Sequence, residues 1–185
     1  MGTMIGTGKD VVSFLKRQHS QIKDGFAQVI ATRGEERSKQ FYSLRRLLAV
    51  HETAEEEIVH PAARRALPNG EAVVDARLRE ENAAKTLLAE LEKLDVDSAN
   101  FDARLLELQR DVLAHAQAEE TLEFERLADV LDATRLERMG KAAELAEQFA
   151  PTRPHAGVES AAANLFVGPF AAMIDRTRDA LSGKG

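Results

Sequence analysis

The chain has 185 residues, with 31 acidic against 25 basic side chains, a net charge of −6 and no cysteine. The lack of cysteine excludes disulfides, cysteine-ligated zinc, iron–sulfur clusters and thiol catalysis. The acidic balance argues against a nucleic acid or an anionic membrane surface as partner. Any bound metal must therefore be held by histidine and carboxylate, a ligand set suited to iron, manganese or zinc.

Helix-forming residues dominate the sequence, and helix breakers divide it at intervals. Thr7-x-x-Asp10 and Thr134-x-x-Glu137 have the spacing of capping boxes, which predicts that helices begin there. The short connections between long helices predict an all-α protein, an antiparallel up-down-up-down four-helix bundle with additional C-terminal helices. The helical periodicity places the four bundle helices at roughly 8–32, 36–67, 70–94 and 100–131.

The C-terminal part is expected to differ from the bundle. We expect a bundle domain at 8–131 and a C-terminal helical extension at 132–185, with a proline-rich turn at 151–154. The extension contains a helix at about 134–149 and an amphipathic helix at about 159–182. That last helix would dock on the bundle or on a second subunit, so the chain is expected to be a monomer or a homodimer. No signal peptide or membrane span is evident, and we expect a cytoplasmic protein without membrane partners.

Histidine and glutamate interrupt the apolar stripe of each predicted bundle helix. Residues three, four and seven positions apart share one side of a helix, so the interrupting side chains point inward together with the apolar ones. On this pattern Ile58 in the second helix and Leu122 in the fourth are expected to face the core. The interrupting residues are His19 in the first helix, His51 and Glu55 in the second, Glu81 in the third, and His115 and Glu119 in the fourth.

Inward carboxylates are unfavourable, because a buried charge without a partner costs several kcal/mol, about the scale that removes such residues from cores. Three glutamates at one level of the bundle would also repel one another. A pair of divalent or trivalent metal ions between them would supply the missing positive charge, with histidines completing the coordination. In each His-x-x-x-Glu pair the histidine would bind one ion and the glutamate would reach across to bridge both.

Other polar residues near these positions are less informative. Glu52 is an additional candidate ligand, because it lies next to His51 and could lean toward the second metal ion. His60, which precedes Pro61, is expected to be partly exposed and paired with Glu56, although its role as a ligand stays open. Lys85 is expected to extend outward. The glutamates assigned to solvated faces are Glu56, Glu57, Glu120, Glu123 and Glu125.

Taken together, these motifs resemble the hemerythrin-like (HHE cation-binding) family over about residues 8–131. The match lies in Gln18-His19, in His51-Glu-Thr-Ala-Glu55 with the following residues to Pro61, and in His115-Ala-Gln-Ala-Glu119. The tail that begins Pro151-Thr-Arg-Pro shows a weaker similarity to actinobacterial members of this family. The resemblance implies that His19, His51 and His115 are terminal iron ligands. It also implies that Glu55 and Glu119 bridge two non-haem iron ions joined by an oxo or hydroxo group.

The third helix departs from the family pattern, which usually has a histidine where this chain has Glu81. A glutamate makes the site more anionic, and anionic oxygen donors favour ferric over ferrous iron. The sequence therefore favours a di-iron protein that binds or turns over O₂, H₂O₂ or NO, with catalase-like peroxide decomposition as one activity, over a reversible O₂ carrier. Two other interpretations stay open: a non-catalytic iron-binding sensor or sequestering module, and a metal-free helical interaction domain.

Overall fold

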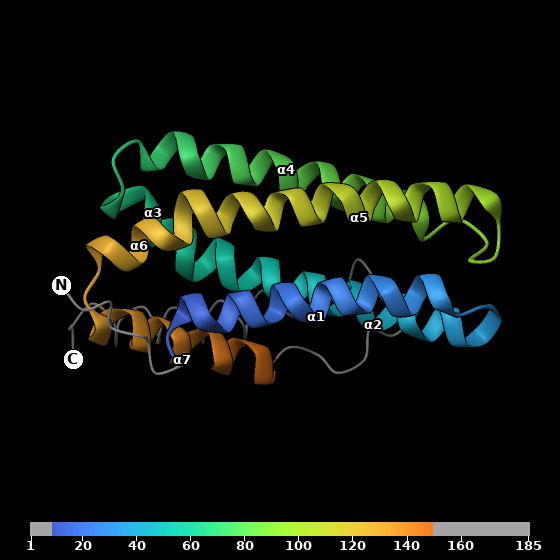
Figure 1. Cartoon of the computed structure of the whole chain (residues 1–185), viewed down its shortest axis with the longest axis horizontal. Helices are drawn as coiled ribbons and strands as arrows, with labels where there is room; N and C mark the ends of the chain where they lie inside the picture. The colour runs from blue at the N-terminus through green and yellow to red at the C-terminus, as the bar shows by residue number, and fades with distance from the viewer. Residues whose placement is uncertain (1–8, 150–185) are drawn as a thin grey trace.

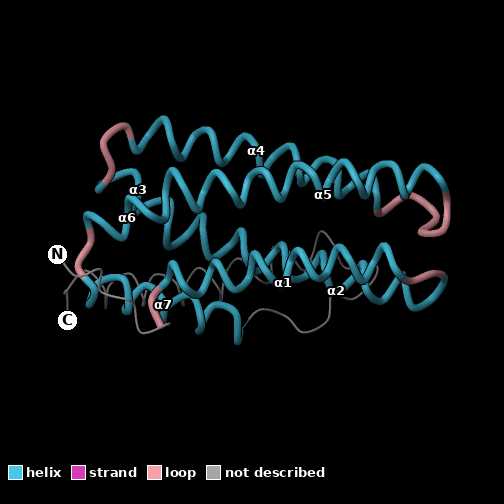
Figure 2. The backbone as a smooth tube through the Cα atoms, viewed as in Figure 1, coloured by secondary structure: helices cyan, strands magenta, loops and turns pink. Residues whose placement is uncertain are grey.

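The computed structural model describes residues 9–149, and the predicted proline-rich turn and last helix lie outside them. Within this range every regular element is a helix, and four long helical rods lie side by side (Figures 1 and 2). This confirms the predicted all-α, four-helix architecture. The elements in chain order are α1 (Val11–Ala31), α2 (Gly34–Ala54), η1 (Glu55–Val59), α3 (His60–Ala66), α4 (Gly70–Leu91), α5 (Ala99–Glu119), η2 (Glu120–Phe124), α6 (Glu125–Val130) and α7 (Ala133–Phe149).

Two of the four rods contain a π-helical turn. The second rod runs from α2 through η1 into α3, and the fourth runs from α5 through η2 into α6. In each turn a backbone N–H bonds the carbonyl five residues earlier: His60 to Glu55 in η1, and Glu125 to Glu120 in η2. A π-turn inserts a residue into the helix and rotates everything beyond it relative to the α-helical repeat. Beyond each π-turn, the positions that face the interior of the bundle are therefore shifted by one residue relative to a regular α-helix.

The helix starts differ in detail from the predicted capping boxes. Asp10 caps α1, accepting hydrogen bonds from the Ser13 backbone N–H at 3.0 Å and from its hydroxyl at 2.8 Å. At the start of α7 the Asp132 carboxylate accepts a hydrogen bond from the Arg135 backbone N–H at 2.9 Å. An aspartate just before the first helical residue thus performs the capping that the sequence pattern assigned to Thr134.

Helix α7 packs against α1, α2 and η1, beside the end of the bundle formed by α3 and α6 (Figure 1). Its Leu136, Met139 and Ala143 join the same buried apolar cluster as Val11 and Phe14 of α1. The helices approach closely at Gly140, where an added Cβ would lie 2.3 Å from the Lys9 carbonyl oxygen. The seventh helix is thus packed into the bundle core.

The apolar core consists of two clusters, separated along every rod by a polar layer. On α1 the first cluster ends at Leu15 and the second begins at Ile22. On the second rod the order reverses, with Leu48 in the second cluster and Ala54 in the first. Antiparallel rods therefore bring their polar interruptions to one level. No helix in the described part of the chain is long and apolar enough to cross a membrane.

Candidate metal centre

The polar layer contains the six residues that interrupt the predicted apolar stripes. Glu55 and Glu119 are fully buried, and Glu81, His51 and His19 have exposed fractions of 2%, 4% and 7%. The His115 side chain is slightly more accessible, at 11%. Residues from α1, the second rod, α4 and the fourth rod therefore meet in the interior of the bundle.

These six residues form two groups of four that share both buried glutamates. The first, which we call the two-histidine group, contains His19, His51, Glu55 and Glu119. The second, the three-glutamate group, contains Glu55, Glu81, His115 and Glu119. Within each group, one nitrogen or carboxylate oxygen per residue lies within 4.8 Å of all the others. Such an arrangement is suited to two cations bridged by the shared carboxylates.

The inner nitrogens of the histidines face the shared glutamates. The Nε2 atom of His19 lies 3.3 Å from Glu119 and 3.9 Å from Glu55. The Nε2 atom of His51 lies 3.2 Å from Glu55, and that of His115 lies 3.2 Å from Glu119. All three imidazoles thus point their Nε2 atoms into the polar layer.

Many of these inward atoms lack a hydrogen-bond partner despite their burial. They are Nε2 of His19 and His115, both carboxylate oxygens of Glu55 and Glu119, and Oε2 of Glu81. Buried polar groups without partners are rare in folded proteins, because each loses its hydration without compensation. Nitrogen and carboxylate donors aimed at a common interior point are the chemistry that a metal ion satisfies. The residues present therefore fit a metal centre.

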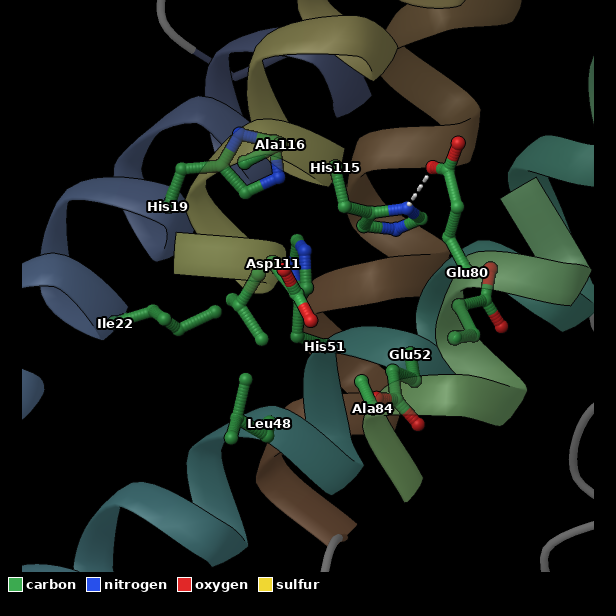
Figure 3. A pocket seen from close by; sticks show the side chains of 12 residues that line it. His19, Ile22, Leu48, His51, Glu52, Glu80, Ala84, Asp111, His115 and Ala116 are labelled. Carbon is green, nitrogen blue, oxygen red and sulfur yellow. Dashed lines mark hydrogen bonds and ion pairs between the residues drawn. The ribbon is translucent and has the colours of Figure 1, made fainter. Parts of the chain in front are cut away.

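Each of the three histidines is held from outside by its other ring nitrogen. The Nδ1 atom of His19 is 2.8 Å from Glu120, that of His51 is 3.0 Å from the Gln18 side-chain oxygen, and that of His115 is 2.8 Å from Glu80. Figure 3 shows the His115–Glu80 contact at the edge of the site. An Nδ1–H that donates to an outer acceptor leaves Nε2 with its lone pair free to bind a cation.

Burial and mutual repulsion shift the pKa values of these groups in different directions. Burial raises the pKa of Glu55 well above its ordinary range, and the charges of Glu119 and Glu81 raise it further. Burial lowers the pKa of His51 to about 3. For Glu119, burial acts to raise the pKa, but the neighbouring imidazoles of His115 and His19, at 3.2 and 3.3 Å, outweigh it and lower the pKa. Without a cation, the layer therefore disfavours the ionised form of Glu55, which a bound cation would favour.

A small cavity of about 20 Å³ adjoins the site. Its polar lining includes His19, His51, Glu81 and His115, and its apolar lining includes Ile22, Leu48, Ala84, Val112 and Ala116 (Figure 3). A space of this size holds roughly one water molecule or a small di- or triatomic ligand. The cavity beside the candidate centre therefore has room for a molecule of a few atoms.

The structure places Glu52 at the wall of this cavity, outside both groups. Its carboxylate lies 3.3 Å from the Lys85 ammonium, and burial raises its pKa to about 7. Lys85 extends outward as expected, and its closest contact is Glu56 at 2.6 Å. Glu52 thus lines the approach to the site rather than joining the glutamates at its centre.

Two expectations about polar residues were wrong, and the first of them, on His60, was wrong because it assumed a regular α-helix. His60 is 2% exposed, and it lies between Glu81 at 2.8 Å and Glu123 at 3.0 Å, not beside Glu56 at the surface. In an α-helix a residue five positions after Glu55 would point about 140° away from it. The π-turn η1 brings His60 back to the inward face.

The second error concerns the fourth rod, where Glu123 is fully buried and not on a solvated face. It follows Glu119 by one helical turn, so the same spacing rule could have identified it. Leu122, predicted to face the core, is 43% exposed, and Phe124 is fully buried in its place. Phe124 stacks on His19 with ring centroids 5.7 Å apart. Glu120 also has a role at the site, since it is the partner of His19 Nδ1.

Comparison with known proteins agrees with this geometry. The family model of the hemerythrin HHE cation binding domain matches residues 10–127. The crystal structure of a hemerythrin HHE cation binding domain-containing protein from Mycobacterium kansasii superposes with a TM-score of 0.69 at 17% identity. That match covers 91% of this chain and 98% of the mycobacterial chain, and at this identity it shows a shared fold. No curated protein matches the sequence. The chain therefore belongs to the family of hemerythrin HHE cation-binding domains.

Proposed function

We propose that this protein holds two non-haem iron ions and binds or turns over small oxidants such as O₂, H₂O₂ or NO. The observation that carries the proposal is the pair of four-residue groups sharing Glu55 and Glu119. One ion would be held by the two-histidine group and the other by the three-glutamate group. Iron in such a ligand set supplies a redox couple and a Lewis acid.

The surroundings of the site support a small ligand. The cavity of about 20 Å³ reaches three of the candidate histidine ligands and Glu81. The outer hydrogen bonds that the three rings donate to Glu120, Gln18 and Glu80 fix the orientation of the imidazoles. The protein itself therefore orients the metal-binding atoms beside a cavity with room for a molecule of a few atoms.

Glu81 favours oxidative chemistry or sensing over reversible O₂ carriage. It gives the three-glutamate group a single imidazole, and its side chain is almost fully buried. Anionic oxygen donors stabilise the higher oxidation state of iron, whereas a reversible carrier must recover the ferrous pair after each cycle. We therefore infer that peroxide decomposition is the first activity to assay.

The test uses purified protein loaded with iron without oxygen. We expect its absorption spectrum to change on exposure to O₂, H₂O₂ or NO, and we expect peroxide to be decomposed with release of O₂. Glu119→Gln removes one shared carboxylate and should abolish these responses, whereas Glu125→Gln alters an exposed residue of the same rod and should not. Iron-loaded protein that neither decomposes peroxide nor changes its spectrum with any of the three oxidants would refute the proposal.

A sensor or iron-sequestering module is the alternative, and one chain of contacts favours it. The His51 ring is held by Gln18, whose amide in turn donates to Glu147 of α7 at 3.3 Å. This chain connects the metal centre to the helix that follows the bundle. A large metal-dependent rise in thermal stability without any turnover of peroxide would support this function over catalysis.

A further inference from the structure

A buried chain of three side chains extends from the three-glutamate group to two residues that do not line the cavity. Glu81, His60 and Glu123 are 2%, 2% and 0% exposed, respectively. His60 Nε2 lies 2.8 Å from Glu81 Oε1, and His60 Nδ1 lies 3.0 Å from Glu123 Oε1. The sequence left a ligand role for His60 open and assigned none to Glu123, and neither residue belongs to the candidate metal groups.

The two oxygens of Glu81 have different surroundings. Oε1 accepts a hydrogen bond from His60, whereas Oε2 is buried without a hydrogen-bond partner. Both ring nitrogens of His60 face carboxylates, which accept hydrogen bonds when ionised, so the ring donates in both directions. Hydrogen bonds to charged partners are stronger than neutral ones, and two of them fix the orientation of the ring. One Glu81 oxygen is therefore fixed by His60, whereas the other has no hydrogen-bond partner and lies 3.9 Å from the Lys85 ammonium.

The backbone makes this arrangement possible. His60 follows directly after the π-turn η1, whose first residue is the shared ligand candidate Glu55. Glu123 lies within the second π-turn, η2, which follows directly after Glu119. Each π-turn thus has a shared glutamate at its start or just before it, and one member of the outer chain within it or directly after it.

We propose that His60 is a positioning residue that, anchored by Glu123, restricts Glu81 to one-oxygen coordination in the three-glutamate group. The inference rests on the proposed metal centre. The two metal positions would then differ in a defined way. The two-histidine position would depend on rings held by Gln18 and Glu120, and the three-glutamate position on a carboxylate held by a histidine.

The test is an anaerobic titration of the full chain with Fe(II) against a competing chelator, which resolves the affinities of the two positions. In His60→Leu we expect Fe(II) affinity at the three-glutamate position to fall about 10–100-fold, the usual effect of losing a residue that orients a metal ligand. Affinity at the two-histidine position should stay within about twofold of wild type, since His19 and His51 keep their partners. His60→Gln retains an N–H donor toward Glu81 and should restore part of the lost affinity.

His60→Leu leaves Glu123 buried without its partner, so the double variant His60→Leu/Glu123→Met is included in case the single variant fails to fold. The double variant should show the same selective loss at one position. Unchanged affinities, or a parallel loss at both positions with a lower thermal midpoint, would overturn the inference and leave His60 with a structural role only. Wild-type protein that binds no Fe(II) would instead refute the proposed function itself.

Discussion

The buried carboxylates should make the stability of the protein strongly dependent on bound metal. Glu55, Glu81 and Glu119 lie in the interior with most of their inward oxygens unpartnered. A ligand present at a thousand times its dissociation constant stabilises the folded state by about 4 kcal/mol. For a chain of this size each kcal/mol changes the melting temperature by about 2–4 °C, so a chelator should lower it by roughly 8–16 °C.

Glu55→Gln separates this explanation from a general effect of metal on folding. Glutamine keeps the shape of the side chain but removes the charge whose burial, together with Glu119 and Glu81, raises the pKa of Glu55. In chelator, the variant should therefore melt at or above the wild-type temperature. With iron present it should melt well below wild type, because one of the two shared ligands is lost. The change in melting temperature caused by Glu55→Gln should thus be zero or positive without metal and negative with metal.

Differential scanning calorimetry with and without chelator measures both effects. Glu57→Gln, at an exposed position of the same π-turn, is the matched control and should behave like wild type in both conditions. If Glu55→Gln lowered the melting temperature equally with and without metal, Glu55 would be a structural residue and the charge argument would be refuted.

Three further predictions concern residues around the site and at the ends of the bundle. Gln18→Leu removes the acceptor for His51 Nδ1–H and should weaken metal binding about 10–100-fold in a chelator competition. The control Gln21→Leu, at an exposed position of the same helix, should bind metal like wild type. Equal affinities of the two variants would contradict the role of Gln18. A hydrogen bond from buried Arg37 lowers the pKa of Asp102, so the pair stabilises the fold above the ordinary pKa of that carboxyl, and this stabilisation is lost as pH falls through the lowered value. Asp102→Asn should therefore unfold at lower denaturant concentration than wild type near neutral pH, with the difference vanishing in strong acid; a difference independent of pH would contradict the ion pair. Gly140→Ala places a Cβ 2.3 Å from the Lys9 carbonyl oxygen, so it should lower the unfolding free energy measured in denaturant titrations by about 1–3 kcal/mol. An unchanged unfolding free energy would show that α7 does not pack closely on α1.

The positions of the inward polar residues were predictable because most of each helix follows a regular repeat. His19 on α1 and Glu81 on α4 lie in uninterrupted α-helices, where spacing alone shows which side chains face the core. Antiparallel packing then predicted that polar interruptions near the middle of each helix meet at one level. The structure brings all six together, while their assignment as ligands stays a proposal.

The inward position of His60, beyond Glu55, and the exposure of Leu122, beyond Glu119, were not predictable from the same repeat. Both π-turns begin at or directly after these glutamates, and local sequence does not distinguish a π-turn from an α-helical turn. The one-residue shift exposes Leu122, leaves Ile58 only partly buried, and brings His60 inward. π-Turns occur frequently at functional sites, and here both lie beside the glutamates shared by the two groups. The residues whose orientation differs from the predicted one therefore lie beside the candidate centre.

The most direct test is elemental analysis of the purified full-length protein after expression with sufficient iron. Two iron ions per chain are predicted, one for each group of four residues. Protein that is fully folded and contains no metal, or a single ion per chain that persists at saturating iron, would contradict the paired centre.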